Sequence, residues 1–102
     1  MRYEFHPEAE QEFVEAAAYY ERNVSGLGER FGSEVHRAID RLLEYPELGP
    51  PIDADLRRLM LIRFPYSLIY SFTSDLLRVV AVAHARRRPG YWRSRVTGRE
   101  DR

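Results

Sequence analysis

Two stretches in the first half of the chain place apolar residues at the spacing of an α-helix. Pro7 suits the first turn of a helix, because the N–H that proline lacks has no partner there. Pro46 cannot continue a helix, so the second stretch must end just before it. The pattern predicts helices over about 7–23 and 27–45, joined by a short connector and paired as a hairpin.

Both helices also carry charged residues on the side away from the apolar stripe. Glu34 lies within helical reach of Arg30 and Arg37, which predicts two surface ion pairs of about a few tenths of a kcal/mol each. We expect most of the remaining carboxylates to be solvated. Since neither helix can bury its apolar stripe alone, a sheet must cover both.

After the proline-rich loop at 46–51, the apolar period changes to two residues. The alternation predicts strands over 2–5, 57–64, 66–73 and 77–84. The connections between the last three strands are short, so these strands must be antiparallel. The expected fold class is therefore α+β, in the order β-α-α-β-β-β, with the helical hairpin packed on one face of a small antiparallel sheet.

Length and composition fit one small globular unit: 102 residues, of which 44% are hydrophobic and 31% charged. We expect a single domain over 1–95 and a polar C-terminal tail over 96–102. No apolar run approaches the ~20 residues of a membrane span. The chain also has no cysteines and no signal-peptide core near its start. We therefore expect a cytoplasmic protein without disulfides.

The formal net charge of zero conceals a strong asymmetry. Residues 1–55 carry 13 acidic residues against five arginines, whereas residues 56–102 carry 11 arginines against three acidic residues. All 16 basic residues are arginines. The asymmetry indicates a charged partner, although the two halves also attract each other within one fold.

The candidate chemistry is concentrated in the basic half. The three histidines form no ligand pair at helical or strand spacing, so we expect no metal and no other cofactor. Arginines bind phosphates and aromatic rings stack on bases, while His84 and Tyr91 are able to move a proton. Metal-free RNA cleavage needs such a set. The candidates are Arg57, Arg58, Arg63, Arg78, His84, Arg86, Arg87, Arg88, Tyr91 and Trp92.

Each candidate also has a purely structural interpretation. His84 ends a strand on the same predicted face as Val80 and Val82, which is equally the position of a structural histidine. Tyr91 and Trp92 either stack on a ligand or fold back onto the core. The arginine run before them either contacts a target or pairs with acidic groups.

Several segments, in the same order along about residues 1–95, resemble the RelE/ParE toxin superfamily. These segments are Tyr19-Tyr20-Glu21, Phe31 with Glu34, Arg63 to Tyr70, Val80 to His84, Arg86, Arg88-Pro89 and Tyr91-Trp92. The resemblance implies the fold derived above and the toxin half of a bacterial type II toxin–antitoxin module of the plasmid-stabilisation kind. It also implies growth inhibition, and silencing by a small cognate antitoxin that wraps a segment across the toxin in a hetero-oligomer.

The superfamily divides by target. RelE-like members cut messenger RNA on the ribosome with basic residues and a tyrosine, whereas ParE-like members inhibit DNA gyrase and lack that catalytic set. Ser67 stands where RelE-like members carry a phosphate-binding arginine. The resemblance therefore favours gyrase as the target, with ribosome-dependent, metal-free mRNA cleavage as the alternative.

The two targets imply different roles for the candidate residues. For a nuclease, the resemblance and the chemistry point to Arg58, His84, Arg86 and Tyr91 as catalytic residues. For contact with a target or with the antitoxin, the candidates are Arg57, Arg63, Arg87, Arg88 and Trp92. A third hypothesis is an inactive member whose basic half serves only to bind an acidic partner.

Overall fold

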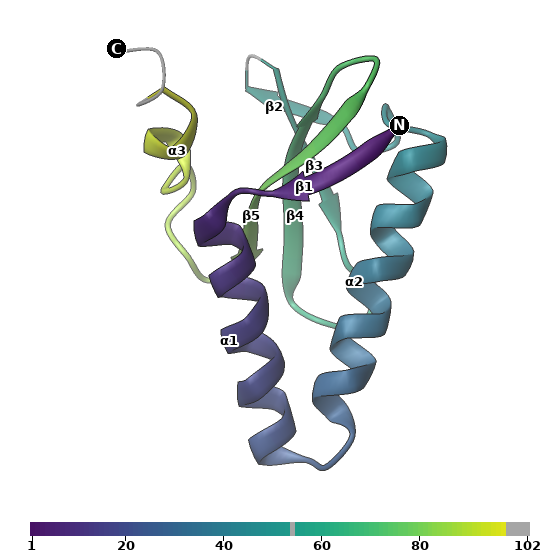
Figure 1. The fold of residues 1–102 in the computed structure, drawn as a ribbon. Helices are drawn as coiled ribbons and strands as arrows, with labels where there is room; N and C mark the ends of the chain where they lie inside the picture. The colour runs from purple at the N-terminus through teal and green to yellow at the C-terminus, as the bar shows by residue number, and fades with distance from the viewer. Residues whose placement is uncertain (54, 98–102) are drawn as a thin grey trace.

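The computed structural model describes residues 1–53 and 55–97. The elements follow the order β1 (Arg2–Phe5), α1 (Pro7–Asn23), α2 (Leu27–Glu44), β2 (Pro51–Asp53), β3 (Leu56–Met60), β4 (Tyr66–Phe72), β5 (Leu76–His84) and α3 (Arg93–Thr97). The two long helices form a hairpin on one face of a five-stranded sheet (Figure 1). The predicted α+β class and the predicted packing of a helical hairpin on a sheet are confirmed.

The turn between the helices depends on two glycines. Gly26 adopts a φ of 87°, a left-handed conformation that glycine enters without strain. A Cβ on Gly28 would lie 2.4 Å from the carbonyl oxygen of Ala17, so only glycine lets α2 approach α1 this closely. The Glu21 carboxylate accepts the N–H groups of both glycines, at 2.9 and 3.0 Å. These contacts determine the geometry of the hairpin.

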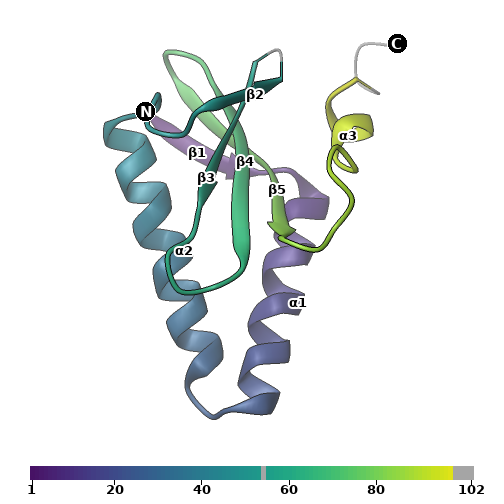
Figure 2. The same cartoon turned by 180° about the vertical axis from the view of Figure 1, so that it is seen from behind.

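The strand order in the sheet is β1-β5-β4-β3-β2. β1 runs parallel to β5, and the other neighbours are antiparallel. β2 is a short strand that the sequence pattern did not predict, and it pairs with the start of β3. Viewed from behind, the sheet is not covered by the long helices, and α3 lies at its side (Figure 2). We call this the open face.

Two apolar clusters lie on the two faces of the sheet. The larger one, under the helices, includes an aromatic group in which the ring of Phe31 lies 5.1–5.4 Å from those of Tyr20, Phe64 and Tyr66. The smaller one, on the open face, contains Leu56, Ile69, Val80, Ala81, Ala83 and Trp92. Burial of a large apolar side chain contributes about 1.5–3 kcal/mol, so the helix-covered cluster supplies most of the stability.

The predicted strand over 57–64 is too long. β3 ends at Met60, because the Glu34 carboxylate accepts the N–H groups of Ile62 and Arg63 at 2.5 and 3.1 Å and holds the chain in a loop. Pro65 has no N–H to offer to a ladder. Arg63 therefore lies in the loop between β3 and β4 and does not share a strand face with Arg57.

The predicted alternation along β5 is also interrupted. The register between β4 and β5 shifts next to Tyr70, which leaves Val80 as an extra residue in β5. Val80 consequently packs in the open-face cluster while Val82 packs under the helices. The expectation that these two valines share one face is wrong.

The first two residues of the expected polar tail are helical. We expected Val96 and Thr97 in that tail, but both belong to α3, and Val96 packs against the open-face cluster. The rest of the expected tail, 98–102, lies outside the described residues. α3 thus forms part of the wall of the open face.

Candidate functional site

One carboxylate of α1 is an exception to the expected solvated face. Glu12 accepts four hydrogen bonds: from the Val82 N–H at 2.9 Å, the Tyr91 hydroxyl at 2.8 Å, and two guanidinium nitrogens of Arg95 at 2.7 and 3.0 Å. We call these four residues the Glu12 cluster. The Arg95 side chain is only 8% exposed. The cluster therefore joins α1, β5 and the C-terminal segment.

The Glu12 cluster also covers an edge of the sheet. β1 pairs with β5 only as far as Val79, so the next edge groups of β5 need other partners. Glu12 accepts the N–H of Val82, and Arg95 donates to the carbonyl oxygen of Val80 at 3.0 Å. Two side chains thus replace a neighbouring strand at this position.

Charge and burial shift the pKa values in this cluster in opposite directions. Burial by itself would raise the pKa of Glu12, but the hydrogen bonds from Arg95, Val82 and Tyr91 outweigh it and hold that pKa below 4.5. Burial raises the pKa of Tyr91 far above its ordinary value of 10.0, and the hydrogen bond to Glu12 raises it further. Glu12 is thus the anion, and the Tyr91 hydroxyl keeps its proton and donates it in the hydrogen bond to Glu12.

The open face carries a small cleft that we call the open-face cleft. Its volume is about 80 Å³. It is lined by Arg58, Ser67, Ile69, Ala83, His84, Ala85, Arg87, Pro89 and Trp92. Of the candidate catalytic residues, Arg58 and His84 meet here, whereas Tyr91 and Arg86 are not among the lining residues. The four predicted catalytic residues therefore do not all line this cleft.

His84 lies half-buried at the end of β5. Its Nδ1 accepts the N–H of Arg86 at 3.0 Å, which places the proton of a neutral imidazole on Nε2. Its ring packs edge-on against Tyr66, with the centroids 5.0 Å apart. The imidazole thus has a fixed orientation, with one nitrogen already engaged by its own chain.

Several other candidates have structural contacts. Arg57 donates to the carbonyl oxygens of Glu47 and Gly49 at 3.1 and 2.8 Å, which holds the loop before β2. Arg78 pairs with Glu4 at 2.6 Å. Arg57 thus has a structural contact in this fold, and its role as a target or antitoxin contact stays a prediction.

Three further candidates come from the segment after β5. Trp92 is 7% exposed and caps the open-face cluster. The guanidinium carbon of Arg87 lies 3.8 Å from the centre of the Tyr91 ring. Arg88 is exposed. Of the two interpretations that the sequence left open for Trp92, the structure therefore favours packing on the core.

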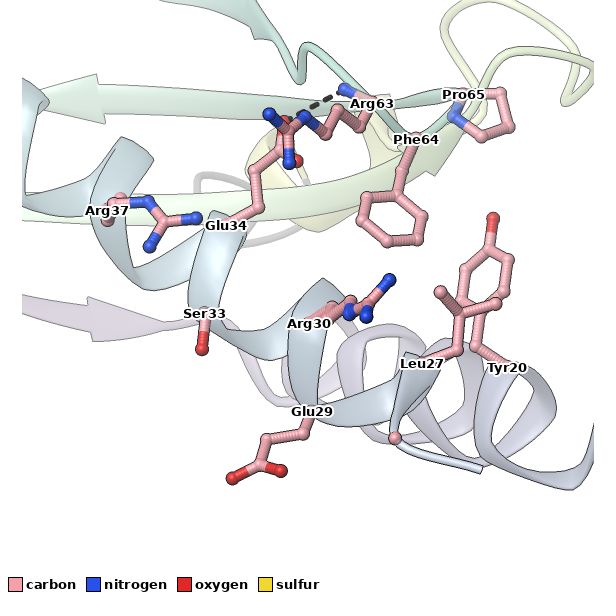
Figure 3. Close-up of a pocket in the computed structure, with 11 residues that line it drawn as sticks. Tyr20, Leu27, Glu29, Arg30, Ser33, Glu34, Arg37, Arg63, Phe64 and Pro65 are labelled. Carbon is pink, nitrogen blue, oxygen red and sulfur yellow. Dashed lines mark hydrogen bonds between the residues drawn. The ribbon is translucent and has the colours of Figure 1, made fainter. Parts of the chain in front are cut away.

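A larger depression runs between α2 and the loop after β3. Its main part has a volume of about 790 Å³ and includes Arg30, Arg37 and Arg63 among its lining residues. In Figure 3, Arg30 and the rings of Phe64 and Tyr20 face the same space. An adjoining part adds Arg41, Met60 and Ile62. We call the whole surface the arginine groove.

The arginine groove departs from the predicted charge pairing. Glu34 makes no ion pair with Arg30 or Arg37; instead its carboxylate binds the loop amides. Within residues 1–53 and 55–97, the four groove arginines have no carboxylate within 4.0 Å. Beside them, Met60 and Ile62 are 69% and 80% exposed. The groove therefore combines unpaired positive charge with exposed apolar side chains.

Comparisons with known proteins agree with the fold. A family model described as "ParE toxin of type II toxin-antitoxin system, parDE" matches residues 3–89, and the chain belongs to this family. A search of curated proteins finds no match. A solved structure titled "Chromosomal ParDE TA system from P. aeruginosa" has a similar fold, with a TM-score of 0.60 at 13% identity over 82% of this chain and 95% of that one.

Family membership confirms the predicted class: the chain is a toxin of the type II toxin–antitoxin kind, and the family implies a cognate antitoxin. The family match ends at residue 89, before Tyr91, Trp92 and α3. Among the described residues, no helix is both long and apolar enough to span a membrane. Of the residues that line the open-face cleft, Trp92 alone lies beyond the matched region.

Proposed function

We propose that this toxin inhibits DNA gyrase and does not cut RNA. The Tyr91 hydroxyl is the main support, because it donates to Glu12 at 2.8 Å and Tyr91 does not line the cleft that holds Arg58 and His84. Metal-free RNA cleavage requires a group that protonates the leaving oxygen. Ser67, which lines the cleft, also offers no cation for the phosphate. Membership of the ParE family supports the same target.

A DNA supercoiling assay tests this proposal. The purified toxin is titrated into gyrase with relaxed plasmid DNA and ATP, and we expect a concentration-dependent loss of supercoiling that the cognate antitoxin reverses. Expression without antitoxin should likewise arrest growth. Unchanged supercoiling at saturating toxin would overturn the proposal, and harmless expression would favour an inactive member.

Primer extension on a translated message tests the alternative. We expect no new ends at the ribosomal A site when the toxin is added. If new ends did appear and Tyr91→Phe and His84→Ala both abolished them, the ribosome-dependent nuclease would replace gyrase inhibition as the function.

We assign the antitoxin to the arginine groove. Its four arginines attract carboxylates, and the exposed Met60 and Ile62 offer an apolar contact. An amphipathic antitoxin segment with acidic and apolar side chains would complement both features. This assignment explains why one basic region of the toxin lacks internal partners.

A further inference from the structure

We infer that two copies of this toxin associate through β1, with the two β1 strands paired antiparallel about a two-fold axis. The inference does not depend on which target the toxin inhibits. We call the outer side of Arg2–Phe5, away from β5, the β1 edge.

The two edge strands of the sheet, β1 and β2, differ in their protection against further strands. β2 begins with Pro51, and its register with β3 is irregular. A proline and an irregular register both hinder the addition of another strand. β1 contains no proline, and its register with β5 is regular. The β1 edge is therefore the side of the sheet that accepts a strand.

The outward backbone groups of the β1 edge have no partners in the described chain. The N–H of Arg2 donates to the carbonyl oxygen of Asp75, just before β5, at 3.1 Å. Because successive N–H groups of a strand point in opposite directions, that of Tyr3 points away from β5. No hydrogen bond of residues 1–53 and 55–97 involves the N–H or the carbonyl oxygen of Tyr3. In Figure 1, no other element passes in front of β1.

The side chains of β1 divide between the two faces of the sheet. Phe5 packs against the helix-covered cluster, and the ring of Tyr3 lies 6.1 Å from its ring. Arg2 and Glu4 therefore point to the open face. There Glu4 pairs with Arg78 at 2.6 Å but remains 40% exposed. Arg2 is exposed and has no carboxylate of the described chain within 4.0 Å. The β1 edge thus carries one unpaired cation and one accessible carboxylate.

These two charges favour a second copy as the partner and select one register for it. An antiparallel pair centred on Tyr3 places Arg2 of each copy directly opposite Glu4 of the other. Centring the pair on Arg2 or on Glu4 instead would place like charges opposite each other, which is destabilising. A two-fold pair also closes on itself, so it forms a dimer and not a fibre.

The favoured register also satisfies the backbone. Tyr3 and its counterpart form a hydrogen-bonded pair, which uses the outward N–H and carbonyl groups of both copies. Arg2 and the opposite Glu4 form a non-hydrogen-bonded pair, in which side chains approach most closely. Each Glu4 carboxylate then lies between Arg78 of its own chain and Arg2 of the other copy. Because the paired strands are short, we expect a weak dimer with a Kd on the order of 10–100 µM.

Sedimentation velocity of the full chain over concentrations that bracket this Kd tests the dimer. The mass should rise from 12.1 kDa towards twice that value. Arg2→Glu and Glu4→Arg each place like charges opposite each other, so each should raise the Kd by at least about tenfold. An equal mixture of these two variants should dimerise again, because opposite charges then face each other at both positions. Arg22→Glu, a charge reversal on α1, is the control and should dimerise like the wild-type protein.

Tyr3→Pro tests the backbone independently of charge. It removes the outward N–H at the centre of the pair and leaves the hydrogen bonds to β5, so dimerisation should be lost. Tyr3→Val keeps this N–H and should still dimerise. Circular dichroism verifies that each variant is folded, and the mixing experiment stands alone if Tyr3→Pro is not.

Three results would overturn the inference. A mass of 12.1 kDa at every concentration, or an undiminished dimer in Tyr3→Pro, would exclude the β1 edge as an interface between copies. A mixture of Arg2→Glu and Glu4→Arg that stays monomeric would exclude the register. Protection of the Tyr3 amide from hydrogen exchange only when the antitoxin is added would assign the β1 edge to the antitoxin. Sedimentation uses the toxin alone, so a negative result would not affect the proposed inhibition of gyrase.

Discussion

Each long helix has a glutamate whose carboxylate accepts backbone N–H groups from another part of the fold. Glu12 on α1 accepts the N–H of Val82, and Glu34 on α2 accepts two N–H groups of the loop after β3. Their surroundings differ. Arg95, beside Glu12, is paired with two carboxylates, whereas the arginines beside Glu34 are paired with none in the described chain.

This difference distinguishes two uses of arginine in one small protein. Where the guanidinium is buried and hydrogen-bonded within the protein, as in Arg95, it joins elements of the fold. Where guanidinium groups line a groove with exposed Met60 and Ile62, they remain available to a partner. Net charge along the sequence does not separate the two uses, because it counts both equally.

The largest effect on stability should come from a substitution in the buried Glu12 cluster. Glu12→Gln leaves the Arg95 guanidinium buried beside a neutral side chain, so the free energy of unfolding should fall by about 3 kcal/mol in urea denaturation at pH 7. Glu8→Gln is the matched control. Glu8 also pairs with Arg95 but is 62% exposed, and its loss should cost less than about 1 kcal/mol. Equal losses in the two variants would contradict the structural role of Glu12.

Acid should remove the same stabilisation. The pKa of Glu12 is lowered in the folded protein, so its contribution is present above the unfolded value of 4.5 and is lost as the pH falls through the lower folded value. The stability difference between the wild-type protein and Glu12→Gln should therefore be constant near neutral pH and shrink below about pH 4.5. A urea series across pH 3 to 7 measures it, and a difference that grows on acidification would refute the sign.

On α2, Glu34→Ala should lower the free energy of unfolding by less than Glu12→Gln does. The Ile62 and Arg63 N–H groups lose their shared acceptor, but water reaches this exposed loop, so we expect a loss of about 1–2 kcal/mol by urea denaturation. Glu34→Gln keeps an oxygen at the same place and should lose less. If both variants cost the same, the acceptor role of this side chain would be wrong.

Tyr91→Phe tests whether the Glu12 cluster is structural or catalytic. Removing the hydroxyl deletes one hydrogen bond to Glu12, so stability should fall by about 1 kcal/mol in thermal unfolding. Inhibition of gyrase should remain unchanged in the supercoiling assay. Full loss of toxicity with unaltered stability would instead support a proton-donating role for Tyr91.

The smallest change in stability should come from a substitution in the arginine groove. Arg37→Glu should leave the free energy of unfolding within about 0.5 kcal/mol, because this arginine pairs with no carboxylate of the described chain. It should nevertheless weaken antitoxin binding by about tenfold or more in calorimetry, since a repulsive charge replaces an attractive one. Arg22→Glu, outside the groove, is the control. Equal affinity in both variants would place the antitoxin elsewhere.

Local pattern predicted the helical part of this fold well. Pro7 and Pro46 limit the two helices in the structure as they do in the sequence, because proline acts through its own ring and missing N–H. The short strand over 2–5 is also confirmed. The toxin class followed from blocks of adjacent residues, and such blocks are visible without coordinates.

Contacts between distant residues were not predictable in this way. Nothing in the sequence near Met60 indicates that β3 ends there, because the cause is Glu34 on α2. Likewise, the sequence predicts that Glu12 is solvated like its neighbours. In the structure, α3 places Arg95, 83 positions away in the chain, within hydrogen-bond distance of Glu12. The assembly of the open-face cleft from three strands and the segment before α3 has the same origin.

The sequence alone therefore determined the two long helices, the approximate positions of β1, β4 and β5, the fold class and the toxin family, because these depend on periodicity, proline placement and short blocks. Only the tertiary structure decided which charges are used within the fold and which remain on the surface. The physical reason is that ion pairing and burial depend on distances of a few ångströms between residues far apart in the chain, and local spacing does not specify those distances.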